Sequence, residues 1–500
     1  MSTNPAPLYT ADQVREFDRI AIEEQGIDGY ALMEQAGEAA FAALLSQWSQ
    51  VRHLVVVCGA GNNGGDGYVM ARLAHQHDIQ VELLAVTPVD KLTGSAKVAA
   101  DAAIEVGLTP ANEIQWPQSG VVVDALLGTG LKGEVNAEKA RVIQQINDSG
   151  LPVVAVDVPS GLDANTGCVL GCAVKAHMTV TMIGNKQGLF TGQGPIYAGE
   201  VRLAKLGVPN AVVEQQTPSS QLISWRQLFK DNPLTGRREL DCHKGQLGHV
   251  MILGGDLGYG GAVIMAAGAA LRSGAGLVSV ATRSEHVPAL LAKYPEVMVH
   301  AVDGGQDVQP LLPKADVLVV GPGLGQSHWG QQILQQVFAL NTPVVLDADA
   351  LNLLAAGRIK HNLNDRLSVM TPHPGEAGRL LETGSAAIQQ DRFSAVRALQ
   401  DKFHSLVVLK GLGSLVGFDQ EIAICTDGNP GMASGGMGDV LSGVLGAMVA
   451  IQQASECTEF SDAVLTAVCL HSAAADQAAG DGENGMVATD LLAMIRSLIN

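Results

Sequence analysis

The chain has 500 residues, of which 47% are hydrophobic and 16% charged, and its formal net charge is −19. This length is too great for one ordinary domain and predicts two or three, each with a large core. The acidic balance argues against nucleic acid or an anionic membrane as the main partner. It still allows an anionic small molecule, which local backbone dipoles can bind.

Cysteine usage and the chain start bear on the compartment. The seven cysteines include no CxxC pair, so we expect reduced thiols rather than a disulfide framework or a zinc site. The opening residues MSTNPAPLYT are polar, and the apolar stretch 261–281 is interrupted by Arg272. We therefore expect no signal peptide and no membrane span, but a cytoplasmic homo-oligomer that acts on small molecules.

The first half alternates apolar strands with amphipathic helices. Helices are expected at residues 11–25 and 32–47, and strands at residues 53–58, 80–86, 121–125, 153–156 and 178–182. Short β-branched runs that are buried on both faces are typical of parallel sheets. The first half is therefore predicted to be a Rossmann-like, doubly wound α/β domain.

This pattern lapses in a polar, aperiodic stretch, and we predict a linker at residues 216–224 between domains at 1–215 and 225–500. One very large α/β domain is the alternative. The second half again alternates a helix-like stretch at 262–273 with short apolar runs. Its strands are expected at residues 249–253, 276–281, 317–320, 344–347, 368–371 and 406–410.

The most informative motif of the first half is GAGNNGGDG at residues 59–67, between the strand at 53–58 and a helix-like run at 68–77. Glycines allow close backbone approach, and N–H groups at a helix N-terminus favour a phosphate. We interpret the motif as a ligand-binding loop, with a simple tight turn as the alternative. Asp124 and Asp157 each end a further strand, where open α/β sheets bind ligands, although either residue could instead form a turn.

Four motifs together resemble the NAD(P)H-hydrate epimerase domain over residues 10–215. They are LMEQAG at 32–37, NNGGD at 62–66, GTGLKGE at 128–134 and DVPSG at 157–161. The resemblance implies epimerisation of hydrated NADH and NADPH, with a potassium ion held by Asn63, Asp124 and Ser160. It implies substrate contacts by Asn62, Asn63, Gly64, Gly65, Asp66, Gly128, Thr129, Gly130, Leu131, Lys132, Gly133, Glu134 and Asp157. Asp157 is our candidate acid/base, because epimerisation at a hydroxylated ring carbon requires proton transfer.

The most informative motif of the second half is NPGMASGGMGD at residues 429–439, which leads into an apolar helix. A glycine-rich turn at a helix N-terminus binds anions, and a carboxylate on the first turn can deprotonate a hydroxyl that attacks a phosphoryl group. This layout is typical of ribokinase-like enzymes, and the alternative is that Asp439 only caps the helix. KGLGS at 410–414 is expected to be a second phosphate loop. His373 lies between prolines and could be structural, and His471 and Asp476 are interpreted as core or surface residues.

Residues 225–500 resemble the ADP-dependent NAD(P)H-hydrate dehydratase, a ribokinase-like α/β domain. The resemblance implies contacts to the hydrate by Ala262, Gly323, His373 and Asp439. It implies ADP, with Mg²⁺ bridging its phosphates, bound by Lys410, Gly411, Leu412, Gly413, Ser414, Asn429, Pro430, Gly431, Met432, Ala433, Ser434, Gly435, Gly436, Met437 and Gly438. Position 256 is Asp, where a small hydroxyl residue is common in that family.

The two resemblances predict an isomerase and a hydro-lyase in one chain that repairs NAD and NADP cofactors. A ribokinase-type small-molecule kinase with an accessory domain is one alternative, but it has no need of the NNGGD motif. A non-catalytic nucleotide sensor is another, but it has no need of Asp157 or Asp439.

Overall fold

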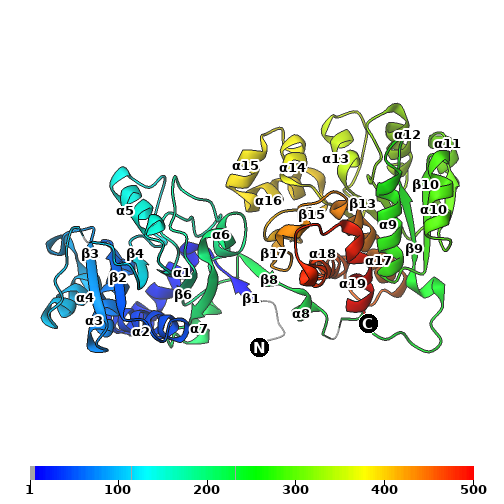
Figure 1. Ribbon diagram of the computed structural model, residues 1–500. Helices are drawn as coiled ribbons and strands as arrows, with labels where there is room; N and C mark the ends of the chain where they lie inside the picture. The colour runs from blue at the N-terminus through cyan, green and yellow to red at the C-terminus, as the bar shows by residue number, and fades with distance from the viewer. Residues whose placement is uncertain (1–5, 114, 231) are drawn as a thin grey trace. The chain divides into compact units, whose positions relative to one another are not determined.

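A computed structural model of the chain describes residues 6–113, 115–230 and 232–500. The chain divides into two compact units, Pro7–Gln221 and Leu222–Asn500 (Figure 1). The predicted linker at 216–224 contains strand β8 (Ser220–Ile223). Each unit is described by itself below.

The first unit contains a six-stranded parallel sheet with the strand order β3-β2-β4-β5-β6-β7. Its strands are β2 (His53–Cys58), β3 (Gln80–Ala85), β4 (Val121–Ala125), β5 (Val153–Val156), β6 (Met178–Met182) and β7 (Glu200–Ala204). The first five confirm the predicted strands within one residue. We did not predict β7, because its sequence EVRLA is partly polar and none of its residues is buried, as is typical of an edge strand.

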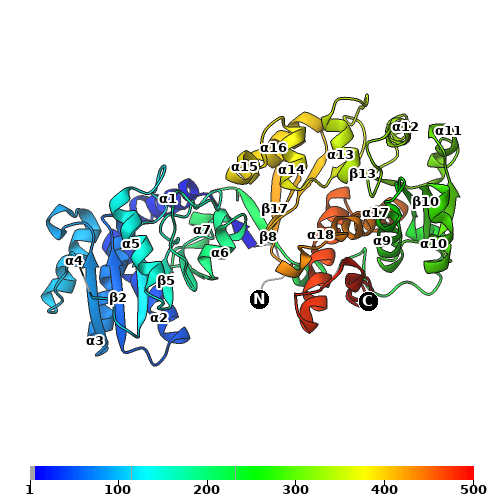
Figure 2. The same ribbon diagram turned by 45° about the horizontal axis from the view of Figure 1, so that its top comes forward.

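Helices cover both faces of this sheet (Figures 1 and 2). Alternate strand residues such as Val56 and Val123 share a core with four helices, whereas Val55 and Val122 face α5 (Ala137–Asp148) on the other side. The four helices are α1 (Ala11–Arg19), α2 (Gly29–Gln47), α3 (Asn62–Gln76) and α4 (Gly94–Glu105). The predicted doubly wound fold is therefore confirmed.

The beginning of α3 corrects one prediction. We expected residues 59–67 to form a loop and the helix to begin near Tyr68, but α3 begins at Asn62. Two of the motif's glycines allow this helix to pack tightly. A Cβ on Gly64 would lie 2.2 Å from the carbonyl oxygen of Gly59, and one on Gly67 would lie 2.6 Å from the Cβ of Ala125. Low helix propensity misled the prediction, because tertiary packing outweighs it here.

The second unit is built on a longer mixed sheet in the order β11-β10-β9-β12-β13-β14-β15-β16-β17. Neighbouring strands from β11 to β15 run parallel. Strand β16 runs antiparallel to both of its neighbours, β15 and β17. The strands are β9 (His249–Leu253), β10 (Leu277–Thr282), β11 (Met298–Ala301), β12 (Val317–Val320), β13 (Val344–Leu346), β14 (Ser368–Met370), β15 (Leu406–Leu409), β16 (Ser414–Phe418) and β17 (Glu421–Cys425). The six predicted strands are present, whereas β11, β16 and β17 were not predicted.

One face of this sheet packs on a layer of four helices, α9 (Gly260–Arg272), α17 (Met437–Ser455), α18 (Phe460–Ala478) and α19 (Leu491–Leu498). The first three are rich in small residues. Helices α9 and α17 approach so closely that a Cβ on Gly443 would lie 2.2 Å from the carbonyl oxygen of Ala266. Although these helices are apolar, none in the described part of the chain has the composition and length of a membrane span.

Candidate active sites

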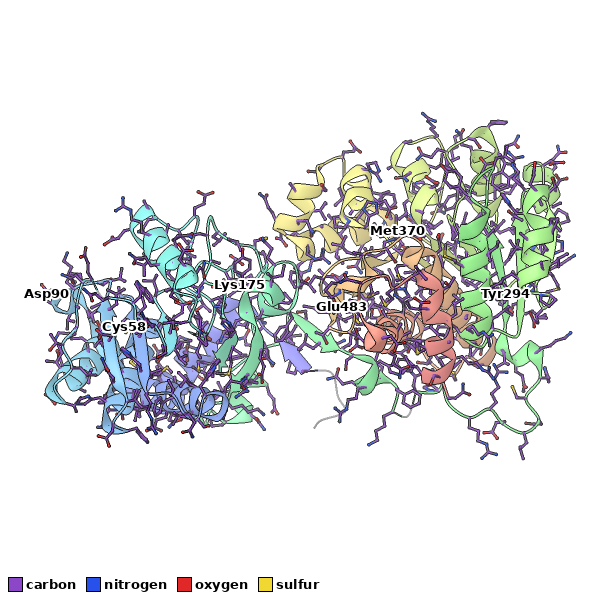
Figure 3. The ribbon with its side chains drawn as sticks, viewed as in Figure 1. Cys58, Asp90, Lys175, Tyr294, Met370 and Glu483 are labelled. Carbon is purple, nitrogen blue, oxygen red and sulfur yellow. The ribbon has the colours of Figure 1, made fainter. Side chains whose placement is uncertain are left out.

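The first unit encloses a cavity of about 540 Å³ at the carboxyl ends of its strands. Its lining residues follow β2, β4, β5 and β6, as expected for a ligand site in an open α/β sheet. Cys58, labelled in Figure 3, is the last residue of β2. Residues expected at the substrate that line the cavity are Asn62, Asn63, Asp66, Gly128, Thr129, Gly130, Leu131, Lys132 and Asp157. Gly64, Gly65, Gly133 and Glu134 are not among the lining residues.

The N-terminus of α3 opens into this cavity. Gly61 precedes the helix, no side chain caps its first turn, and Gly61, Asn62 and Asn63 all line the cavity. A Cβ on Gly61 would meet no atom within 4 Å. Because the first N–H groups of a helix have no partner within the helix, this end suits a phosphate group of a ligand.

The three residues expected to hold a cation lie close together beside the cavity. The buried carboxylate of Asp124 accepts hydrogen bonds from the Ser160 hydroxyl (2.6 Å) and the Ser160 N–H (2.8 Å). The Leu127 carbonyl accepts from Ser160 Oγ (3.2 Å) and from Asn63 Nδ2 (3.0 Å). The Oδ1 atom of Asn63 is buried and has no hydrogen-bond partner among the described residues. Burial raises the pKa of Asp124 to about 6, against the opposing effect of the Ser160 hydrogen bonds.

Asp157 follows β5 in a strained conformation with φ of +67°. Positive φ is uncommon outside glycine, and such strain is often found at functional sites. Its Oδ1 atom accepts hydrogen bonds from the ammonium group of Lys186, from the Met182 N–H (3.1 Å) and from the Thr181 hydroxyl (3.3 Å). Lys186 is fully buried and also donates to the Met182 carbonyl (2.8 Å). Three donors therefore converge on one carboxylate oxygen of Asp157.

Two further carboxyl groups line the same cavity, Asp18 from α1 and Asp66 from α3. Burial, with a contribution from Asp157, raises the pKa of Asp18 to about 6 although Lys186 opposes the shift. Burial and the charges of Asp157 and Asp18 raise the pKa of Asp66 far above its usual value. The sequence analysis missed Asp18 and Lys186. Lys186 follows the end of β6 and could have been found by the strand-end rule, but nothing marks Asp18 within its amphipathic helix.

Lys410 is the centre of the candidate site in the second unit. Its Nζ atom donates to Oδ1 of the buried Asp347 (2.9 Å) and lies 3.9 Å from Oε2 of Glu376. A Cβ on Gly438 would lie 3.4 Å from both Lys410 Nζ and Asp347 Oδ2. The predicted loops 371–376, 410–414 and 429–439 therefore meet, just beyond the end of β14, whose last residue Met370 is labelled in Figure 3.

Asp347 is an anchor that the sequence analysis did not single out, although it directly follows β13. Its carboxylate accepts hydrogen bonds from Lys410, from the Thr371 hydroxyl (2.8 Å) and from the Ser442 hydroxyl (2.9 Å). Burial alone would raise the pKa of Asp347, but Lys410 and these hydrogen bonds outweigh it and lower the pKa. Burial likewise acts against the charged form of Lys410, but Asp347, Glu376 and Asp439 outweigh it and raise its pKa.

Asp439 stands on the first turn of α17, as predicted. No hydrogen bond to its carboxylate is found among the described residues. Burial, together with the negative charge of Asp347, raises the pKa of Asp439 to about 7, although Lys410 opposes the shift. A carboxylate with this pKa can accept and release protons near neutral pH.

The loops after β9 and β12 are joined through their backbones. The N–H of Asp256 donates to the Gly323 carbonyl (2.7 Å), and a Cβ on Gly323 would lie 3.2 Å from that of Ala262. Asp256 accepts hydrogen bonds from Arg283 Nε (2.9 Å) and Ser327 Oγ (2.7 Å). Asp256 therefore anchors the turn that holds Ala262 and Gly323, two residues expected to contact the hydrate.

Two other residues stabilise the predicted loops. His373 caps α14 (Pro374–Leu380): its Nδ1 atom accepts from the Gly375 N–H (2.9 Å), and its own N–H donates to Glu376 (2.8 Å). The fully buried Arg392 donates to the carbonyls of Leu409 (3.1 Å) and Gly413 (3.4 Å) and so supports the 410–414 loop. The sequence analysis missed Arg392, because its role depends on contacts across the fold.

Fold and sites together define an α/β enzyme with two separate ligand-binding centres, and comparison with known proteins supports this class. The family model described as "YjeF-related protein N-terminus" matches residues 29–188, and the one described as "NAD(P)H-hydrate dehydratase" matches residues 250–497. A ribokinase-like superfamily protein from Enterococcus faecalis V583 superposes with a TM-score of 0.51 at 29% identity, covering 57% of this chain and 96% of that protein.

Full-length relatives identify the family. The bifunctional NAD(P)H-hydrate repair enzyme Nnr of Coxiella burnetii is 46% identical over 99% of both chains. The enzyme of the same name from Escherichia coli K12 is 43% identical over 99% of this chain and 94% of its own. The chain belongs to the family of bifunctional NAD(P)H-hydrate repair enzymes, with the epimerase domain first and the dehydratase domain second.

Proposed function

We propose that the first unit interconverts the R and S epimers of hydrated NADH and NADPH. The observation that supports this is the cavity itself, because it combines a free helix N-terminus for a phosphate group with ionisable side chains for proton transfer. In this proposal Asn62, Asn63 and residues 128–132 contact the substrate, and Asp157 is the acid/base group beside the reacting ring carbon.

A potassium ion fits the Asn63, Asp124 and Ser160 cluster. The cluster offers a carboxylate, a hydroxyl, the Leu127 carbonyl and the unpartnered Asn63 Oδ1, and oxygen atoms are the ligands that hard cations prefer. When bound, the ion would supply a positive charge that favours the ionised form of Asp124. It would also fix the Asn63 and Leu127 carbonyl oxygens beside the substrate loop.

The second unit, in our proposal, dehydrates the S hydrate to NAD(P)H while ADP is converted to AMP and phosphate. Asp439 takes the proton from the hydroxyl on the hydrated ring carbon, and the hydroxyl oxygen accepts the terminal phosphoryl group of ADP. Phosphate then leaves far more easily than hydroxide and takes the electron pair of the C–O bond. The adjacent ring carbon loses a proton to water, and its C–H electron pair forms the C=C bond that restores the reduced ring. The observation that supports this mechanism is Asp439 itself, which is partly buried at the N-terminus of α17 and has no hydrogen-bond donor on its carboxylate among the described residues.

The glycine-rich turn before α17 and Lys410 would bind the ADP phosphates. Magnesium that bridges the phosphates needs few protein ligands, because phosphate and water oxygens supply most of its coordination shell. Asp347 is already bonded to three donors and Asp439 serves as the base, so we assign no protein ligand to the metal.

A direct test is to incubate the protein with a mixture of R and S hydrates of NADH, plus ADP or ATP, and to follow the absorbance of the reduced nicotinamide. The expected result is full recovery of NADH, with one AMP and one phosphate formed per molecule repaired when ADP is used. Recovery of half the signal would mean that the first unit is not an epimerase. Nucleotide consumption with a sugar or another alcohol in place of the hydrate would favour the ribokinase-type alternative.

A further inference from the structure

The epimerase cavity contains more proton-carrying groups than the proposed function uses. Asp18, Asp66, Asp157 and Lys186 all line it, and they come from α1, from α3, from the end of β5 and from the segment after β6. Segments that are 48 to 168 residues from Asp18 in sequence thus bring ionisable groups to one place. The other charged residues that line the cavity are Arg15, Lys132 and Lys139.

The three carboxyl groups of this cluster are bonded in different ways. Asp157 accepts hydrogen bonds from an ammonium group, a backbone N–H and a hydroxyl. In the described part of the chain, no donor is bonded to the carboxyl group of Asp18 or of Asp66. Lys186 is the only buried cation lining the cavity, and it is bonded to Asp157. The ammonium group of Lys186 is therefore already bonded to Asp157, and a further negative charge on Asp18 or Asp66 in the same cavity is unfavourable. Burial and the neighbouring Asp157 accordingly raise the pKa of both Asp18 and Asp66, which favours a proton on these two groups.

Epimerisation of a carbon that carries both a hydroxyl group and a ring nitrogen requires two such groups. A carboxylic acid gives its proton to the hydroxyl, the C–O bond breaks, and its electron pair leaves with the oxygen as water. The nitrogen lone pair then forms a C=N bond, which makes the carbon planar and the ring cationic. Water adds to the opposite face, the C=N electron pair returns to nitrogen, and a carboxylate takes the proton that the water loses. Atoms and charge balance without any oxidant or reductant.

We propose that Asp18 is a second catalytic residue of the epimerase, which donates the proton to the departing hydroxyl while Asp157 accepts the proton from the incoming water. This inference rests on the proposed epimerase function. Asp157 is bonded to the ammonium group of Lys186. A cationic ring is a strong electrophile, so the water that adds to it needs no stronger proton acceptor than a carboxylate. The same negative charge stabilises the cation. After each turnover the proton returns from Asp157 to Asp18 through the solvent in the cavity.

Asp18 suits the donor role better than Asp66 does. Asp18 is only partly buried, whereas Asp66 is buried against the sheet with 8% of its surface exposed. Burial and the neighbouring Asp157 raise the pKa of Asp18 to about 6, so it can both hold and release a proton near neutral pH. The pKa of Asp66 is raised much further, so this group retains its proton and provides a neutral neighbour.

The test measures the approach of purified R hydrate to the R/S equilibrium in the full-length protein, with the uncatalysed rate subtracted. Asp18→Asn is expected to lower kcat about 10²-fold, as is typical for loss of a general acid. The wild-type rate is expected to fall as pH rises through the pKa of the donor. Asp18→Asn should lose this alkaline decline. Asp18→Glu should show the decline again and react at least tenfold faster than Asp18→Asn. Since the carboxyl groups interact, the apparent pKa belongs to the cluster as a whole.

Glu16→Gln is the matched control, because Glu16 stands on the same helix, its side chain bonds to the exposed Arg19, and it does not line the cavity. ADP-dependent dehydration of S hydrate by each variant reports on the intact fold of the chain. Normal epimerisation by Asp18→Asn, or a slower rate with the wild-type pH profile, would overturn the proposal. Loss of the alkaline decline in Asp66→Asn instead would assign the donor to Asp66. If the wild type itself does not epimerise, the proposed function fails, and this outcome is distinct from the others.

Discussion

The two sites place the carboxylate that accepts a proton in opposite electrostatic environments. Asp157 in the first unit is bonded to the buried ammonium of Lys186 and to two further donors. Asp439 in the second unit has no such partner among the described residues, because the nearby ammonium of Lys410 is bonded to Asp347 instead. Burial and the charge of Asp347 then raise the pKa of Asp439 to about 7.

This difference matches the chemistry proposed for each site. A cationic ring intermediate is stabilised by a carboxylate close to it, and Asp157 is the group proposed for this role. A hydroxyl that must attack a phosphoryl group needs a base whose pKa lies near the working pH, and the partly buried Asp439 has such a pKa. Each site therefore has one lysine whose pairing distinguishes the two proposed roles. Lys186 pairs with the proposed proton acceptor Asp157, whereas Lys410 pairs with Asp347 and leaves Asp439 without a bonded cation.

The largest expected effect is that of Asp439→Asn on dehydration. Loss of a general base typically costs about 10²–10⁴-fold in rate. ADP should still bind, because its contacts are assigned to the glycine-rich turn and to residues 410–414, and the lost negative charge can only favour it. Calorimetry measures binding, and absorbance at saturating ADP measures turnover. If the variant binds and turns over normally, Asp439 is only a helix cap and the phosphoryl-transfer mechanism is wrong.

Asp157→Asn is expected to slow epimerisation about 10²-fold through loss of the proton acceptor. Dehydration of S hydrate by the same protein should continue at the wild-type rate, because it takes place in the other unit. The measurement follows each activity separately with purified epimers. An equal loss of both activities would show a folding defect or a shared site and would contradict the role assigned to Asp157.

The raised pKa of Asp439 predicts an acidic limb in the pH profile of dehydration. The base must be ionised to act, so below pH 7 a growing fraction of the enzyme carries a proton on Asp439 and is inactive. The rate should fall about tenfold for each pH unit well below this pKa. Single-turnover rates at saturating ADP from pH 5 to 8 measure the effect. A flat profile over this range would mean that Asp439 is not the base.

The smallest effect is expected when the two units are separated. The predicted domains each contain a complete site, so fragments covering residues 1–215 and 222–500 should keep epimerisation and dehydration, respectively, within about twofold. The second fragment begins at Leu222 rather than at 225, because Ile223 is part of the buried core of the second unit. Fragments that fold but lose activity would show that the sites depend on each other.

The sequence alone identified the buried parallel strands and several candidate site residues at their ends. Runs such as 53–58 and 317–320 are apolar on both faces, so their pattern identifies them without knowledge of the fold. Asp124, Asp157 and Asp439 were found because the ends of parallel strands and the first turns of helices are places where polar groups meet a ligand. In contrast, the edge strands β7 and β11 were missed, because an exposed edge needs no apolar pattern.

Only the tertiary structure decided which charges neutralise each other. Lys186 and Lys410 each follow a strand, but the sequence does not show that one reaches Asp157 while the other reaches Asp347 rather than Asp439. Nor does it show that Asp18, on a helix before the sheet begins, faces the same cavity as Asp157. Local patterns specify secondary structure because they depend on neighbouring residues. The proton affinity of a carboxyl group depends on burial and on charges a few ångströms away, which only the folded chain brings together.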